Sequence, residues 1–143
     1  MVNKVAKDTE ELLNDIQSAE DIDAYFEENE KHLLDLSFSE YLKLMLKQKS
    51  KTIVEVQRGG RLTNYIYELF SGDKMPTRNT ALQLCFGFEL KPDEAQRLLR
   101  MAKAGALYAK DRRDAVLLFA LKERLNCAAA NDLLEAKGME CLP

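Results

Sequence analysis

The sequence predicts an all-α protein. Apolar residues recur at intervals of three and four along most of the chain, strand-like alternation is scarce, and the breaks between apolar segments carry helix caps and stops. At 143 residues and 46% apolar, the chain is long enough for one domain with a single core. We expect an acidic helical annex over 1–36, a central part over 37–104, and a C-terminal helical extension over 105–143 that packs on the same core.

Residues 1–36 predict two short acidic helices. Leu12, Leu13 and Ile16 share one side of a helix over 9–17, and Asp21 follows at a new helix start. This annex contains three lysines and eleven acidic residues, a net charge of −8. Such a surface repels DNA and suits a basic partner protein.

Capping residues predict the helices that follow. Ser37 with Glu40, and Thr52 with Glu55, have the spacing of capping boxes. The Gly59–Gly60 pair is expected to end a short helix because paired glycines favour a turn. The expected helices cover 38–49, 53–59, 63–70 (with Gly72 as left-handed cap), 81–86 (capped by Thr77 and ended by Gly87), 92–105, 111–124 and 127–138.

Residues 64–80, NYIYELFSGDKMPTRNT, carry the functional signal. They belong to a larger order between residues 38 and 90: a long helix, a short helix, a glycine turn, a second short helix, a basic Ser-Gly turn and a packing helix. A helix-turn-helix needs this order, with the second short helix projecting outward while its back packs on the core. The side chains expected to face base edges offer amide, hydroxyl and carboxylate groups that suit adenine, thymine and cytosine. They are Thr63, Asn64, Tyr65, Tyr67 and Glu68. For the two tyrosines, packing under a neighbouring loop is the alternative.

The basic residues of the chain gather around the same turn. The segment 37–80 has eight basic and four acidic residues, a net charge of +4. Helix starts beside cations suit phosphate, which predicts contacts from Lys51, Thr52, Arg61, Lys74 and Arg78. A solvated basic face without a ligand remains the alternative.

Residues 37–104 resemble the Cro/repressor type of helix-turn-helix regulators, the xenobiotic-response-element family. The segment NYIYELFSGDKMPTRNTALQLCFGFELKPDEAQRLLRMA carries most of the likeness, and the whole chain resembles bacterial members with annexes at both ends. The resemblance implies a five-helix core over 38–104, with Thr52 at the start of the scaffold helix and the five base-contacting residues on the recognition helix. It also places Ser71, Lys74 and Arg78 at phosphate-contacting positions.

The turn VQRGGRLTN departs from the family pattern. Relatives usually place a small apolar residue after the turn glycine, whereas this chain has Arg61. An altered turn, an additional phosphate contact and a loss of DNA binding are the three readings of this difference.

We therefore expect a sequence-specific, double-stranded DNA-binding transcriptional regulator, a repressor, which needs no cofactor and dimerises through its terminal helices. The alternative is a protein–protein interaction adaptor on the same fold that no longer binds DNA, with its partner at the acidic annex. The chain contains no phosphate loop, nucleophile elbow or metal motif, so an enzyme is not expected.

Cellular location and cysteine chemistry follow from composition. No apolar stretch approaches the length of a membrane span, and the N-terminus lacks the apolar run of a signal peptide, which predicts a cytoplasmic protein. Cys85, Cys127 and Cys141 are expected to be reduced and mostly buried. His32 is expected to be a surface or packing residue.

Overall fold

The computed structural model describes residues 36–143, which confirm the predicted all-α class. The described part of the chain contains seven helices and no strand. They are α3 (Phe38–Lys49), α4 (Ile53–Gly59), α5 (Ile66–Ser71), α6 (Arg78–Gly87), α7 (Pro92–Met101), α8 (Arg112–Lys122) and α9 (Cys127–Ala136). No helix over 36–143 has the length and apolar character that crossing a membrane requires. The two helices expected before residue 36, and His32, lie outside the described residues.

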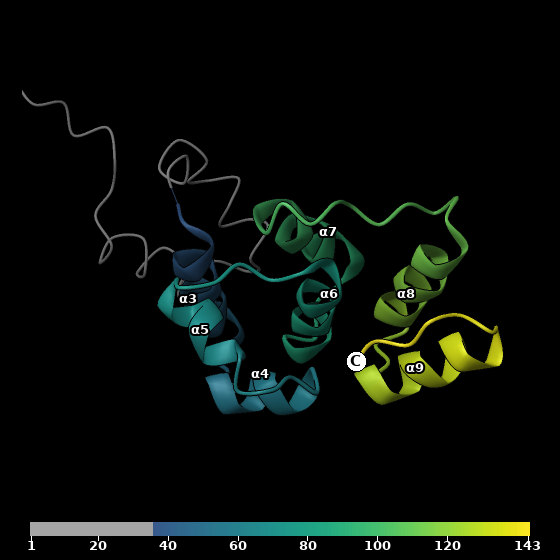
Figure 1. Ribbon diagram of the computed structural model, residues 1–143, viewed down its shortest axis with the longest axis horizontal. Coiled ribbons are helices and arrows are strands. Elements are labelled where there is room, and N and C mark those ends of the chain that lie inside the picture. The colour runs from purple at the N-terminus through teal and green to yellow at the C-terminus, as the bar shows by residue number, and fades with distance from the viewer. Residues whose placement is uncertain (1–35) are drawn as a thin grey trace, which may run out of the picture.

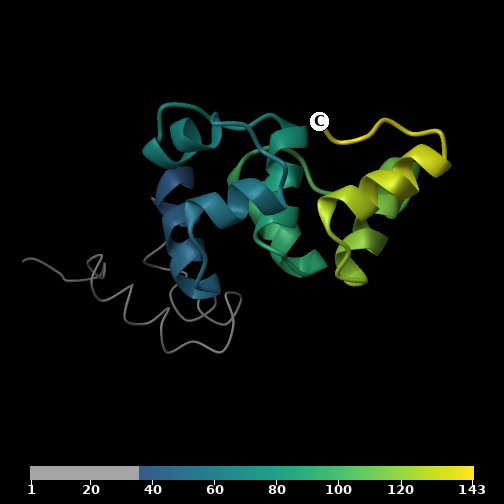
Figure 2. The same ribbon diagram turned by 90° about the horizontal axis from the view of Figure 1, so that it is seen from below.

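Helix α6 lies at the centre of the described structure. It runs between α3 and α5 on one side and the α8–α9 pair on the other (Figures 1 and 2). Every residue from Ala81 to Gly87 is buried. A single apolar cluster extends from Phe38 in α3 to Leu142 near the end of the chain. The C-terminal helices therefore share their core with the central ones.

Most of the predicted helix starts are confirmed by hydrogen bonds. The Ser37 and Thr52 hydroxyls accept from the backbone N–H groups of Glu40 and Glu55, and both capping boxes are complete. Thr77 caps α6, which begins at Arg78 rather than at Ala81. Pro92 opens α7, and Asp111 caps α8. These interactions are local in the chain, which is why sequence alone predicted them.

The helix C-termini follow one pattern that the sequence analysis recognised only in part. After each of the seven described helices stands a left-handed residue, and the next N–H donates back to a carbonyl five residues earlier. Only Gly72 and Gly138 are glycines. The other left-handed residues are Ser50, Arg61, Glu89, Lys103 and Arg124, with φ between 53° and 62°. Helix α7 consequently ends at Met101, before Lys103, and not at the predicted Gly105.

Close contact with a neighbouring helix explains the glycines of α4 and α6. Both helices end where predicted, at Gly59 and Gly87, but Gly60 has an ordinary negative φ of −93°. A Cβ on Gly60 would lie 2.4 Å from the Gln83 carbonyl oxygen, and one on Gly87 would lie 2.4 Å from that of Val56. These glycines therefore allow the backbones of α4 and α6 to touch.

The three cysteines are free, as predicted. Cys85 and Cys127 are buried, and Cys141 is half-buried. Burial raises the pKa of the Cys85 and Cys127 thiols. These two side chains therefore behave as small apolar core groups.

Candidate nucleic-acid interface

Helix α5 has a buried side and an exposed side. Ile66, Leu69 and Phe70 are buried, and the helix packs against α3. On the other side Tyr67 is 45% exposed, and Glu68 is exposed as well. This division follows from the helical spacing of the apolar residues and presents the polar side chains to solvent.

The start of α5 differs from the prediction. The helix begins at Ile66 rather than at Thr63, so Thr63 and Asn64 stand in a tight turn before it. The Ile66 N–H donates to the Thr63 carbonyl at 3.2 Å, and the Tyr67 N–H donates to that of Asn64 at 3.0 Å. Both turn residues are exposed and lie directly before the exposed side of α5.

Asn64 connects the two short helices. Its Oδ1 accepts a hydrogen bond from Nε2 of Gln57 in α4 at 3.0 Å. The carboxamide of Asn64 can still accept a second hydrogen bond and donate through its nitrogen. Gln57 therefore orients Asn64 without using all of its hydrogen-bonding capacity.

The two tyrosines of this segment have different environments. The Tyr65 hydroxyl donates to the Met75 carbonyl at 3.2 Å, and the ring packs against the core cluster. This contact matches the packing alternative and holds the loop that follows α5. Tyr67 makes no such contact within 36–143 and projects outward.

The turn between α4 and α5 is built around Arg61. Arg61 is itself the left-handed residue, with φ 55°, and the Leu62 N–H donates back to the Gln57 carbonyl at 2.9 Å. The Arg61 carbonyl accepts from Nε2 of Gln83 at 3.4 Å, and the same nitrogen donates to the Pro143 carbonyl at 2.7 Å. Arg61 thus forms the same kind of left-handed helix end as the other six described helices, and its side chain is exposed.

Gln83 is a residue that sequence reasoning missed. It is 4% exposed and lies within the apolar run of α6, where it joins the α4–α5 turn to the C-terminal segment. A polar residue inside an apolar helix was the available signal, because a buried amide needs partners. The identity of those partners depended on the tertiary fold.

The loop after α5 exposes one of the predicted phosphate contacts. Lys74 is exposed and forms no ion pair among the described residues. Its backbone N–H donates to the Glu68 carbonyl at 3.3 Å, and Ser71 Oγ donates to the same carbonyl at 3.1 Å. The backbone of the loop is thereby held close to α5 while the ammonium group remains in solvent.

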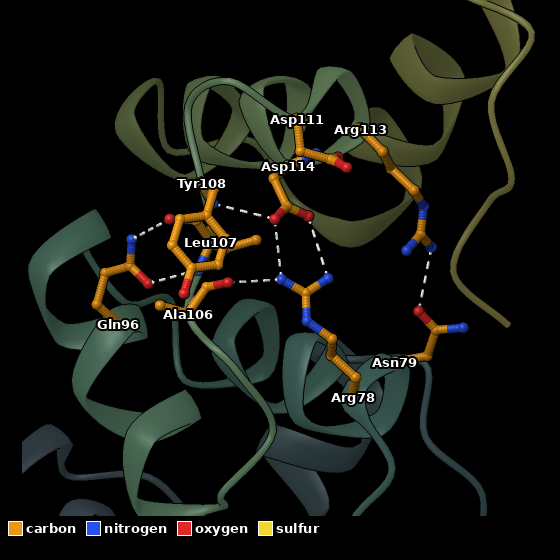
Figure 3. Close-up of polar contacts among 9 residues, drawn as sticks. All are labelled: Arg78, Asn79, Gln96, Ala106, Leu107, Tyr108, Asp111, Arg113 and Asp114. Atoms are coloured by element: carbon orange, nitrogen blue, oxygen red, sulfur yellow. Dashed lines mark hydrogen bonds and ion pairs between the residues drawn. The ribbon is translucent and has the colours of Figure 1, made fainter.

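Arg78 has an intramolecular partner (Figure 3). Its guanidinium donates to both carboxylate oxygens of Asp114, at 3.1 and 2.9 Å, and to the Ala106 carbonyl at 2.8 Å. Asp114 raises the pKa of Arg78, mainly by accepting these hydrogen bonds. A phosphate contact by Arg78 would therefore compete with a bidentate ion pair.

Lys51 is also paired within the protein. Its ammonium lies 2.7 Å from the Glu89 carboxylate. Thr52 uses its hydroxyl to cap α4. Of the cations predicted to contact phosphate, Arg61 and Lys74 are those without an ion pair in the described part of the chain.

A polar network surrounds the ion pair of Arg78. Asp114 is 4% exposed and also accepts from the Tyr108 N–H at 3.0 Å. Arg113 donates to Asn79 at 3.1 Å, as Figure 3 shows. Asp111 caps α8 by accepting from the Asp114 N–H, whereas the Asp114 carboxylate is buried beside Arg78. The network joins the start of α6 to the start of α8.

Comparisons of the chain with family models, with curated proteins and with solved structures gave no match.

Proposed function

We propose that the protein is a sequence-specific, double-stranded DNA-binding regulator of transcription in which α4 and α5 form a helix-turn-helix. The observation that carries the proposal is the division of α5, which buries Ile66, Leu69 and Phe70 while Tyr67 and Glu68 face solvent. A recognition helix requires this arrangement, because its outward side must enter the major groove.

The exposed groups around α5 suit base edges. Asn64 pairs with adenine through its amide, Glu68 accepts from the amino group of cytosine, and the Thr63 methyl group contacts thymine. Tyr67 adds an exposed ring and hydroxyl beside them. Tyr65 drops out of this set because its hydroxyl is bound to the loop at Met75.

Of the cations predicted to contact phosphate, the two that we retain lie on either side of α5. Arg61 stands in the turn before the helix, and Lys74 stands in the loop after it, both with exposed side chains. Thr52 remains as a hydroxyl contact because its hydroxyl only accepts within the protein, from the Glu55 N–H. Ser71 donates its hydroxyl proton to the Glu68 carbonyl, and Arg78 and Lys51 hold carboxylates of the protein. The salt-dependent part of binding therefore falls chiefly on Arg61 and Lys74.

The short length of α5 favours paired binding. A helix of six residues offers a limited area to one groove, so a dimer on two half-sites would supply the missing contacts. A repressor with two such helices would place its half-site centres about 34 Å apart. We assign the dimer contact to the terminal helices.

The proposal is tested by the salt dependence of binding to a short random-sequence duplex, measured by fluorescence anisotropy. We expect Lys74→Ala to lower the slope of log affinity against log salt by about 1, because one phosphate contact is lost. Lys137→Ala is the matched control, since Lys137 is an exposed lysine directly after α9, and α9 lies on the opposite side of α6 from α5 in Figures 1 and 2. An equal slope for both variants, or no binding at low salt, would contradict the proposal and favour the adaptor.

A further inference from the structure

A second candidate site lies apart from α5. A cavity of about 350 Å³ is lined by α4, by the corner between α6 and α7, and by the corner between α8 and α9. Its lining includes Phe86, Leu90 and Leu121, which are at most 3% exposed. This volume is near the lower end of the roughly 300–1,000 Å³ typical of small-molecule sites. Leu125 also lines the cavity and is half-buried, so it offers an accessible apolar surface to a small ligand.

Some of the charged residues that line the cavity have a partner within the protein, and others have none among the described residues. Lys51 and Glu89 form an ion pair at 2.7 Å, and the Glu55 carboxylate accepts from the Thr52 N–H at 2.9 Å. Two further lining residues, Arg58 and Arg124, are exposed and form no ion pair within 36–143. Two guanidinium groups thus remain without a close carboxylate partner.

The pKa values of the two carboxylates agree with this placement of charge. The pKa of Glu89 is lowered chiefly by its hydrogen bond from Lys51, with a smaller contribution from the charge of Arg124. That of Glu55 is lowered chiefly by hydrogen bonds from Thr52, with a smaller contribution from Arg58. The positive charges of Arg124 and Arg58 therefore reach the carboxylates of Glu89 and Glu55, which line the same cavity.

We propose that this cavity binds a small organic anion with an apolar body. The apolar part would rest on the half-buried Leu125, and a carboxylate or sulfonate would accept hydrogen bonds from Arg58 and Arg124. Guanidinium groups suit such anions because they donate through planar, paired N–H groups. The inference does not rest on DNA binding, since Arg58 and Arg124, which would bind the anion, are not among the residues assigned to that surface.

The experiment uses the anionic probe 8-anilinonaphthalene-1-sulfonate, whose fluorescence rises in an apolar site, with the full chain. We expect Arg58→Gln and Arg124→Gln each to weaken binding about fivefold, the loss of one partly exposed charge contact. The uncharged probe N-phenyl-1-naphthylamine should bind both variants and the parent equally. Glu89→Gln should tighten binding of the anionic probe, because it releases Lys51 from its ion pair.

Two control variants separate this cavity from other binding surfaces. Arg100→Gln removes an exposed arginine of α7 that does not line the cavity and should leave binding unchanged. Phe119→Ser alters an apolar recess between α8 and α9 of about 280 Å³, which also includes Leu133 and Lys137. Unchanged affinity in both Arg58→Gln and Arg124→Gln, loss of binding in Phe119→Ser, or absence of saturable binding would overturn the proposal.

Discussion

Helix α6 contacts α4 and α8 in two different ways. Toward α4, the backbones meet at Gly60 and Gly87, where no room for a side chain exists. Toward α8, the contact depends on Arg78 and Asp114, which satisfy each other's charge. The contact with α4 should therefore be disrupted by a substitution that adds volume. The contact with α8 should be disrupted by a substitution that removes one of the two charges.

The largest effect is expected where α4 touches α6. Gly60→Ala should destabilise the protein by about 3 kcal/mol, because the added Cβ would overlap the backbone at Gln83 and force the helices apart. Chemical denaturation monitored by circular dichroism measures the change. The control is Gly138→Ala, which meets no atom within 4 Å but has φ 71° and should cost about 1 kcal/mol through backbone strain alone. Equal costs for the two variants would show that the close helix contact is absent.

The contact between α6 and α8 should give the next largest effect. Asp114→Ala should destabilise the protein by about 2 kcal/mol, less than for a fully buried pair because the Arg78 side chain is 34% exposed. A double-mutant cycle with Arg78→Ala should show a coupling energy of about 1 kcal/mol. Additive effects would mean that the two residues act independently.

The end of α7 lies away from both contacts, so a substitution there changes stability only through the local backbone conformation. Lys103 is left-handed and exposed after α7, so Lys103→Gly should stabilise the protein by about 0.5 kcal/mol by removing the Cβ from that conformation. Lys43 is exposed within α3, and Lys43→Gly should destabilise by about 1 kcal/mol. Denaturation midpoints measure both changes. If both substitutions shifted the midpoint in the same direction, the left-handed conformation of Lys103 would be contradicted.

The smallest effect concerns the exposed ion pair beside α4. The pKa of Glu89 is lowered in the folded state, so its stabilising contribution is present above the unfolded pKa and is lost as pH falls through the folded pKa. Because the Glu89 side chain is 66% exposed, Glu89→Gln should cost only a few tenths of a kcal/mol at neutral pH. The difference from the parent protein should vanish in acid, and a difference that persists would contradict the pair.

Local interactions were predictable from the sequence. The capping boxes at Ser37 and Thr52 and the left-handed Gly72 all depend on residues within one helical turn. The buried side of α5 followed from its apolar spacing. What these features share is that the sequence itself places the interacting groups next to each other.

Tertiary partners were the part that sequence could not supply. Gly60 appeared to be a helix stop, but it is needed for contact with α6, 23 residues further on at Gln83. Arg78 appeared to be a phosphate ligand, but it binds Asp114, 36 residues away. A glycine suits a turn or a close contact, and an arginine suits a phosphate or a carboxylate, so the residue type alone does not distinguish the two roles.

The most direct test of the proposed sequence-specific DNA binding is to let the full chain select sequences from a random pool of double-stranded DNA. We expect an enriched inverted repeat for the parent protein, with one position of each half-site losing its preference in Asn64→Ala. Gln57→Ala is the matched control, because it removes the same hydrogen bond while leaving the Asn64 amide in place. Its motif should remain that of the parent, with a lower affinity because Gln57 no longer orients the Asn64 amide. No enriched motif, or the same motif in Asn64→Ala as in the parent, would contradict the assignment of α5 as the helix that reads DNA.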